Sequence, residues 1–249
     1  MTRLSVNINK VALLRNSRNL GIPSVLRAAE LSVAAGAHGI TVHPRPDQRH
    51  IRPADVFELA DYLIGFPNVE FNIEGNPFPE FLELVHRVKP AQVTLVPDAI
   101  DAPTSDRGWN LNEDAARLAP IAADFQRSGI RVSLFMDVET VDWNRARELG
   151  AARVELYTQP YAEAFAGPDA AKVLALYAAA AAGAQAAGLG VNAGHDLNLS
   201  NLGAFCSIPG ILEVSIGHAL IADALEIGIP AAVCAYLEVL ATVRTDLNS

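Results

Sequence analysis

Eight short apolar segments recur along the chain and alternate with stretches of helical periodicity. Val, Ile, Leu and Phe dominate these segments, which is typical of strands buried on both faces. Eight alternations of strand and helix predict an α/β fold, the (β/α)₈ TIM barrel. The predicted strands cover residues 4–9, 39–45, 69–74, 92–97, 131–137, 153–158, 190–195 and 213–218.

The chain length of 249 residues is typical of one such barrel, so we expect a single domain over residues 1–249. Hydrophobic residues make up 51% of the sequence, which is enough for a barrel core and an outer ring of helices. Two helical segments follow the last predicted strand. At least one helix beyond the minimal barrel is therefore expected.

The chain is acidic, with a net charge of −9, which argues against nucleic acid or an anionic membrane as a partner. Its longest apolar stretch, about residues 173–184, is too short to span a bilayer. Cys206 and Cys234 form neither a metal-binding spacing nor a disulfide framework, and no signal-peptide segment is present. These features predict a cytoplasmic protein.

Polar side chains stand at the carboxyl ends of the predicted strands, where a barrel of this class builds its active site. Proton carriers and anion binders dominate this set, so a catalytic mouth is expected. The residues are Asn7, Asn9, His43, Arg45, Glu74, Asp137, Glu155, Thr158, His195 and His218.

Histidines concentrate at the same end of the barrel. Four of the six, His43, His50, His195 and His218, follow predicted strands. Taken singly, each is more often a hydrogen-bonded loop histidine than a catalyst. Their convergence favours proton transfer, because histidine titrates near neutral pH.

Glu74 and Glu155 end apolar strands, where an unpaired carboxylate is costly. One interpretation is a salt bridge to a neighbouring Lys or Arg. The other is a general base or a group that stabilises a developing positive charge, with burial raising the pKa toward neutrality.

Two features predict anion binding. Gly217 and His218 begin a helix after the eighth strand, which is the usual phosphate position of this fold, and a positive φ at Gly217 is one reason for the glycine there. The segment after the second strand is basic, although one or two of its arginines fit a solvated loop equally well. Its basic residues are Arg45, Arg49, His50 and Arg52.

Residues 98–114 form the longest polar connection, and such loops often serve as lids. Metal chemistry is not favoured, because the sequence contains no HxH, HExxH or CxxC spacing. We therefore predict no metal site.

Taken in order, a set of motifs between about residues 4 and 240 resembles the pyridoxine 5′-phosphate synthase family. The motifs are VNINKVALLRNSR, GITVHPRPDQRHI, FNIE, LVP with a TS-containing loop, VSLFMD, VELYTQPYA, VNAGHDLN and IGHALI. The resemblance implies a cytosolic TIM barrel, usually a homo-octamer, that needs no organic cofactor. It also implies condensation of 1-deoxyxylulose 5-phosphate with 3-amino-2-oxopropyl phosphate to pyridoxine 5′-phosphate, inorganic phosphate and water.

The resemblance also implies roles for individual residues. His43 and Glu74 match proton acceptors, His195 matches a proton donor, and Glu155 matches an electrostatic stabiliser. The implied contacts of deoxyxylulose phosphate include Arg45, His50 and Thr104. The full set of implied substrate-binding residues is Asn7, Asn9, Lys10, Arg18, Arg45, His50, Thr104, Asp196, Gly217 and His218.

The chain departs from the family pattern at two places. Asn9 and Lys10 replace an Asp-His pair, which makes the local charge more positive, and Asp196 replaces a glycine that would approach the ligand closely. Two other functions stay open. One is a barrel aldolase or epimerase, for which Lys10 would be the Schiff-base lysine, and the other is a non-catalytic barrel that serves as a binding module.

Overall fold

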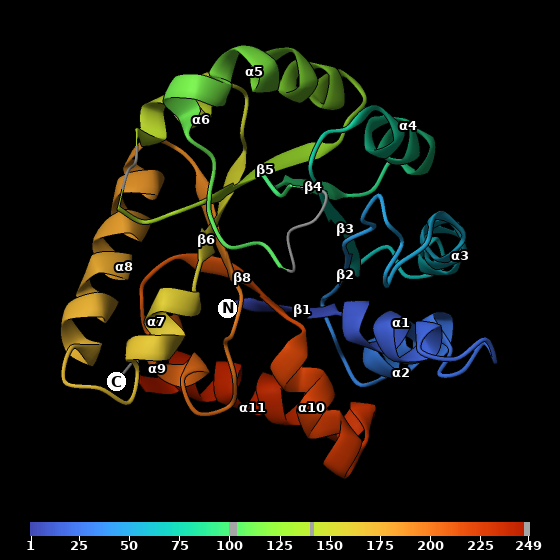
Figure 1. The fold of residues 1–249 in the computed structure, drawn as a ribbon. Coiled ribbons are helices and arrows are strands. Elements are labelled where there is room, and N and C mark those ends of the chain that lie inside the picture. The colour runs from blue at the N-terminus through green and yellow to red at the C-terminus, as the bar shows by residue number, and fades with distance from the viewer. Residues whose placement is uncertain (100–103, 140–141, 247–249) are drawn as a thin grey trace.

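The computed structural model describes residues 1–99, 104–139 and 142–246. Eight parallel strands close into a barrel in the order β1 to β8, and each strand pairs with its neighbours in the sequence. Figure 1 shows the helices arranged around these strands. The strands are β1 (Arg3–Asn7), β2 (Gly39–Val42), β3 (Glu70–Gly75), β4 (Gln92–Leu95), β5 (Arg131–Met136), β6 (Arg153–Tyr157), β7 (Gly190–Gly194) and β8 (Ile211–Ile216). The TIM-barrel prediction is confirmed.

The described helices exceed the eight of a minimal barrel, as expected. Two of them, α10 and α11, follow the last strand and pack on each other. No described helix combines the length and the apolar character that crossing a membrane requires. The helices are α1 (Asn9–Asn16), α2 (Val25–Ala34), α3 (Pro53–Leu63), α4 (Pro79–Val88), α5 (Leu111–Arg127), α6 (Trp143–Glu148), α7 (Gln159–Ala164), α8 (Ala170–Ala186), α9 (Leu202–Cys206), α10 (His218–Ile227) and α11 (Ile229–Asp246).

The first predicted strand is too long. β1 ends at Asn7, and helix α1 begins at Asn9, inside the range 4–9 that was predicted as strand. Val11 and Ala12 on this helix are buried in the core. Tertiary packing of that apolar face outweighs the weak intrinsic helix signal of the segment.

The register of the barrel turns the acidic side chains of its middle layer inward. Glu74 on β3 is paired with Thr94 on β4, and Glu155 on β6 is paired with Phe135 on β5. Both carboxyl groups are buried, so they belong to the barrel interior. The apolar residues of each strand alternate with them and pack beneath the helices.

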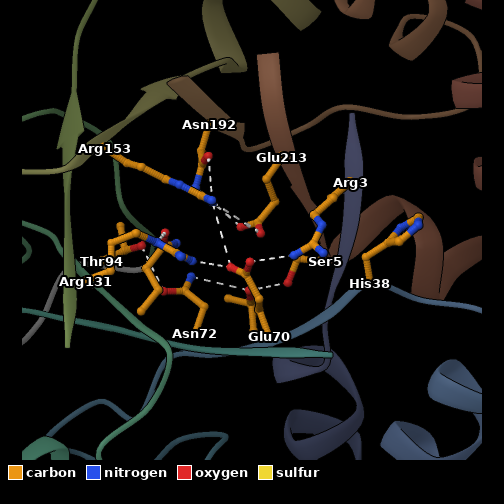
Figure 2. Close-up of polar contacts among 12 residues, drawn as sticks. Arg3, Ser5, His38, Glu70, Asn72, Thr94, Arg131, Arg153, Asn192 and Glu213 are labelled. Carbon is orange, nitrogen blue, oxygen red and sulfur yellow. Dashed lines mark hydrogen bonds and ion pairs between the residues drawn. The ribbon is translucent and has the colours of Figure 1, made fainter. Parts of the chain in front are cut away.

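A charged network fills the amino-terminal end of the barrel (Figure 2). Glu70 lies at its centre and pairs with Arg3 at 2.5 Å and with Arg131, while Arg153 lies 3.8 Å from it. Arg153 also lies 3.8 Å from Glu213. These pairs compensate the charges at the closed end and leave the opposite end to form the cavity.

Candidate active site

A cavity of about 400 Å³ opens at the carboxyl ends of the strands. Every residue to which the family resemblance gives a role lines it except Arg18, so residues from six of the eight strand ends meet in one place. The strand-end residues Asp137 and Thr158, also expected at this mouth, do not line it. The lining residues are Asn7, Asn9, Lys10, Leu13, His43, Arg45, Arg49, His50, Glu74, Thr104, Ser105, Glu155, Gln159, His195, Asp196, Ser215, Gly217 and His218.

Arg18 lies outside this lining. It is exposed on the turn that follows α1. Within one chain the structure therefore does not bring Arg18 to the other candidate residues, and its role in substrate binding stays a prediction.

Several lining residues are absent from the predicted set. Gln159 begins α7, two residues beyond the end of β6, and Arg49 belongs to the basic segment recognised in the sequence. The strand-end pattern could have found both. Ser105 belongs to the predicted lid, residues 98–114, of which residues 100–103 lie outside the described part of the chain.

The two glutamates of the cavity are held in their neutral forms. Burial, reinforced by the charge of Glu155, raises the pKa of Glu74 well above its usual value. Burial and the nearby Glu213 raise the pKa of Glu155 to about 8. Burial therefore favours the protonated form of both side chains, in which each can donate a proton.

Gly194 makes room for one of these glutamates. A Cβ atom on Gly194 would lie 2.2 Å from Oε1 of Glu155. The end of β7 therefore needs a residue without a side chain, so that the carboxyl group of β6 can turn into the cavity. This constraint explains the Gly-His sequence better than a backbone contact alone.

The histidines of the cavity are held neutral as well. Burial, with the charge of Arg45, lowers the pKa of His195 to about 4 and that of His43 well below its usual value. Burial lowers the pKa of His50 to about 4. A neutral imidazole can accept a proton and a neutral carboxylic acid beside it can donate one, so that the two charges that form lie side by side and compensate each other.

Two aromatic side chains pack against the ring of His195. Its ring lies 5.2 Å from the Phe135 ring and 5.4 Å from the Tyr157 ring, measured between centroids. The Thr158 hydroxyl donates to the carbonyl oxygen of Gly194 at 2.6 Å and lies 2.5 Å from that of His195. These contacts hold a backbone with a φ of +83° at His195.

Asp196 shares this left-handed backbone, with a φ of +58°. The family pattern has a glycine at this position, which adopts such a φ without strain, and aspartate is one of the side chains that tolerate it. The carboxylate lines the cavity. The contact of Asp196 with the substrate stays a prediction.

Backbone and amide groups shape the opposite wall of the cavity. Asn7 Oδ1 accepts from the Asn9 backbone N–H at 3.0 Å, and Asn9 Oδ1 accepts from the His43 backbone N–H at 2.9 Å. Gly217 caps the amino end of α10 as predicted. Its φ is −117°, so the idea that this glycine serves a positive φ is wrong.

Asp98, three residues beyond the end of β4, forms an unpredicted part of the site. Its carboxylate pairs with Arg45 at 2.5 Å and accepts from the Ser105 hydroxyl at 2.7 Å. Burial raises the pKa of Asp98, while the hydrogen bond from Ser105 and the charge of Arg45 oppose that shift. A second hollow of about 480 Å³, lined mainly by apolar groups and by Asp98, shares His43 and Arg45 with the cavity.

Among the described residues, no group of three or more His, Cys, Asp or Glu side chains is arranged to hold a metal ion. Lys10, Arg45 and Arg49 bring positive charge to a cavity that also contains paired acids and bases. The arrangement can bind an anionic small molecule and move protons at several of its atoms.

Fold and site together define a (β/α)₈ barrel enzyme for acid–base chemistry on anionic small molecules. The chain belongs to the family described as pyridoxal phosphate biosynthesis protein PdxJ, whose model matches residues 4–242. Two curated relatives named pyridoxine 5′-phosphate synthase are each 55% identical to it. The match to the relative from Albidiferax ferrireducens spans 98% of this chain and 99% of the relative. The match to the relative from Xanthomonas axonopodis pv. citri covers 96% of each. The family and the enzyme class expected from the sequence are confirmed.

Solved structures of other barrels share the fold at low identity. TrpF from Jonesia denitrificans matches with a TM-score of 0.62 at 15% identity, covering 98% of each chain. Phosphoribosyl anthranilate isomerase from Thermus thermophilus matches with a TM-score of 0.60 at 16% identity, covering 97% of this chain and all of the other. These likenesses concern the fold alone.

Proposed function

We propose that the protein catalyses the pyridoxine 5′-phosphate synthase reaction. In this reaction 1-deoxyxylulose 5-phosphate condenses with 3-amino-2-oxopropyl phosphate, and pyridoxine 5′-phosphate, inorganic phosphate and water leave. The observation that carries the proposal is the meeting of His43, Glu74, Glu155 and His195 in one cavity with cationic side chains at its rim.

The first pair of groups is His43 and Glu74. His43 Nδ1 lies 3.8 Å from Glu74 Oε2, and both side chains are buried. The neutral imidazole accepts a proton from the substrate, while Glu74 in its acid form supplies one. Glu74 becomes the second proton acceptor only after it has donated, or once a cationic amine or imine beside it favours the carboxylate.

Glu155 lies deeper in the barrel, where water is excluded. Its raised pKa means that a positive charge must arrive before it ionises. An iminium formed from the substrate amine supplies this charge, and the carboxylate that results stabilises it. His195 completes the set as a proton donor to a leaving hydroxyl: its neutral ring takes up a proton on one nitrogen and gives up the N–H proton of the other, so that no imidazolate forms.

The two phosphate groups need separate anion sites. Arg45, His50 and Thr104 suit deoxyxylulose phosphate on one side of the cavity. Asn7, Gly217 and His218 suit the aminooxopropyl phosphate, because α10 begins at His218 and directs its free N–H groups at the ligand.

The proposed enzyme is cytoplasmic and a homo-octamer, as the family resemblance implies. Large apolar side chains exposed on and after α1 support a subunit contact there. They are Leu13, Leu14, Leu20 and Ile22. Arg18 lies within this same stretch.

The test is a product assay with both substrates and no added metal, following pyridoxine 5′-phosphate absorbance together with phosphate release. We expect equal amounts of the two products. Release of phosphate without the pyridine product would contradict the proposal. Borohydride trapping of substrate on Lys10 would instead favour the aldolase alternative.

A further inference from the structure

Asp98 is more deeply buried than a residue of a polar connecting loop usually is. Its exposed fraction is 6%, and its carboxylate oxygen Oδ2 accepts from Arg45 and from Ser105. The Asn76 side chain donates to its backbone oxygen at 2.9 Å. These contacts fix Asp98 between the loops that follow β2, β3 and β4.

His43 lies between two buried acids. Its Nδ1 faces Glu74 at 3.8 Å, and its Nε2 faces Oδ2 of Asp98 at 3.9 Å. Both distances exceed hydrogen-bond length, and catalytic hydrogen bonds often tighten only when substrate is bound. Each ring nitrogen therefore has its own acidic partner.

The chemistry of Glu74, His43 and Asp98 indicates which of their atoms carry a proton. Burial favours the acid form of Glu74, which can donate its proton to the ring nitrogen that faces it when that nitrogen carries a lone pair. The other nitrogen, Nε2, carries the hydrogen and faces Asp98. The ion pair with Arg45 keeps Asp98 suited to accept that hydrogen.

The second carboxylate oxygen of Asp98 supplies an independent observation. Oδ1 is buried and has no hydrogen-bond partner within the described part of the chain. An unsatisfied buried acceptor costs about 1–3 kcal/mol, so a purely structural residue would be expected to satisfy both oxygens. The unsatisfied oxygen is unfavourable for a purely structural residue, but it suits a side chain that gains a hydrogen-bond partner during the reaction.

We propose that Asp98 is a positioning residue for the synthase reaction, acting through His43. Its carboxylate selects the form of His43 with the hydrogen on Nε2, so that Nδ1 is the basic nitrogen. When Nδ1 takes a proton from the substrate, the imidazolium that forms is stabilised by Asp98 through Nε2–H. Because Oδ2 also pairs with Arg45, Asp98 links the proposed phosphate-binding loop that contains Arg45 to the base, His43.

This inference rests on the proposed function, and kinetics of Asp98→Asn test it. The amide is nearly isosteric and can still accept from Arg45, but it carries no charge. We expect kcat to fall at least about tenfold, equivalent to about 1.4 kcal/mol. The KM for deoxyxylulose phosphate should not rise, because Arg45 is released from a competing anion.

A matched control breaks another buried Asp–Arg pair. Asp55 pairs with Arg15 away from the cavity lining, with side-chain exposures of 9% and 12%. Asp55→Asn should lower thermal stability as much as Asp98→Asn does, while kcat stays within about twofold of the wild type.

A double-mutant cycle decides whether Asp98 acts through His43. In a His43→Gln background, adding Asp98→Asn should cost no further kcat, because the group it positions is gone. Additive losses, a raised KM at unchanged kcat, or wild-type kcat in Asp98→Asn would each overturn the proposal. A wild-type enzyme that makes no pyridoxine 5′-phosphate would instead defeat the proposed function itself.

Discussion

The protonation states of single residues decide how this cavity works. Burial and neighbouring carboxylates raise the pKa of Glu74 and so favour its acid form. The sequence alone suggests a general base at this position, because it shows the strand end but not the carboxylates from other strands. The carboxylates that barrel closure brings near Glu74 favour its protonated form. The residue therefore begins the reaction as an acid, and its place in the mechanism is unchanged.

Replacing Glu74 by glutamine tests this role. The amide keeps the shape of the side chain but can neither give nor take a proton, so turnover should fall about 10²–10⁴-fold with the fold intact. Steady-state rates and a melting curve check the two halves of the prediction. Glu74→Asp, which keeps an ionisable group, should retain more activity than the glutamine variant. Turnover above about a third of wild type in Glu74→Gln would remove the residue from the mechanism.

Sequence reasoning reached residues that end strands and missed those that a loop delivers. His43, Glu155 and His195 stand within a residue of their strands, so strand periodicity located them. Asp98 stands three residues further on, and its burial depends on contacts with Arg45 and Asn76 from other loops. No local pattern in the sequence encodes such contacts.

At the scale of elements, a glycine at the end of a strand decides whether a neighbouring strand can present its catalytic group. Gly194→Ala places a Cβ atom 2.2 Å from Oε1 of Glu155, a distance that forces the carboxyl group to move. We expect kcat to drop at least about tenfold, since a displacement of about 1 Å can cost a hundredfold. Gly203→Ala is the control, because its Cβ would meet only Val239 at 3.6 Å. Equal activity of the two variants would show that Glu155 is not held by this contact.

The start of α10 makes a second prediction about an element. A Cβ on Gly217 would lie 3.2 Å from the Asn7 side chain, so valine there would crowd the first helical turn and any phosphate bound to it. Gly217→Val should weaken binding of the aminooxopropyl phosphate far more than binding of deoxyxylulose phosphate. Calorimetric titration of each ligand separately measures this. Equal losses would indicate general damage to the barrel mouth, and no loss would place the phosphate elsewhere.

Helix α1 shows where element prediction fails. The strand pattern located all eight strands because each is a buried apolar run, but it extended the first strand to residue 9, where α1 has already begun. Its helix is weakly amphipathic and has no side-chain cap. Packing of Val11 and Ala12 against the barrel stabilises it, and this information lies in distant residues.

At the scale of the whole molecule, the barrel interior carries more ionisable groups than a packed core normally tolerates. The amino-terminal network balances its charges in pairs, but the site does not. Burial raises the pKa of Glu213 to about 7, and Glu155 stands above it with a pKa of about 8. The pKa values of these groups differ between the folded and the unfolded chain, so the free energy of unfolding depends on pH.

The sign of this dependence can be worked out group by group. A carboxyl group with a raised pKa binds a proton in the folded state that the unfolded chain releases, so its stabilisation is present below about pH 4.5 and is lost as pH rises to its folded pKa. A histidine with a lowered pKa behaves in the opposite sense, because the unfolded chain takes the proton. His50 and His195 therefore stabilise the fold above about pH 6.5 and lose that contribution toward about pH 4.

Between about pH 4.5 and 6.5 the carboxyl groups and the histidines change the free energy of unfolding in opposite directions. Above about pH 6.5 only the carboxyl groups still titrate. Unfolding free energy should therefore decline from about pH 6.5 to 8, by up to about 1.4 kcal/mol per pH unit for each group. Denaturant curves at one fixed protein concentration measure it, since assembly also contributes to stability. Glu155→Gln should flatten the decline by removing one titrating group, whereas Glu58→Gln on the exposed side of α3 should leave it unchanged. An equally steep decline in the wild type and both variants would mean that Glu155 is already ionised in the folded barrel. Its ionisation in response to the substrate cation, as the proposed mechanism requires, would then be contradicted.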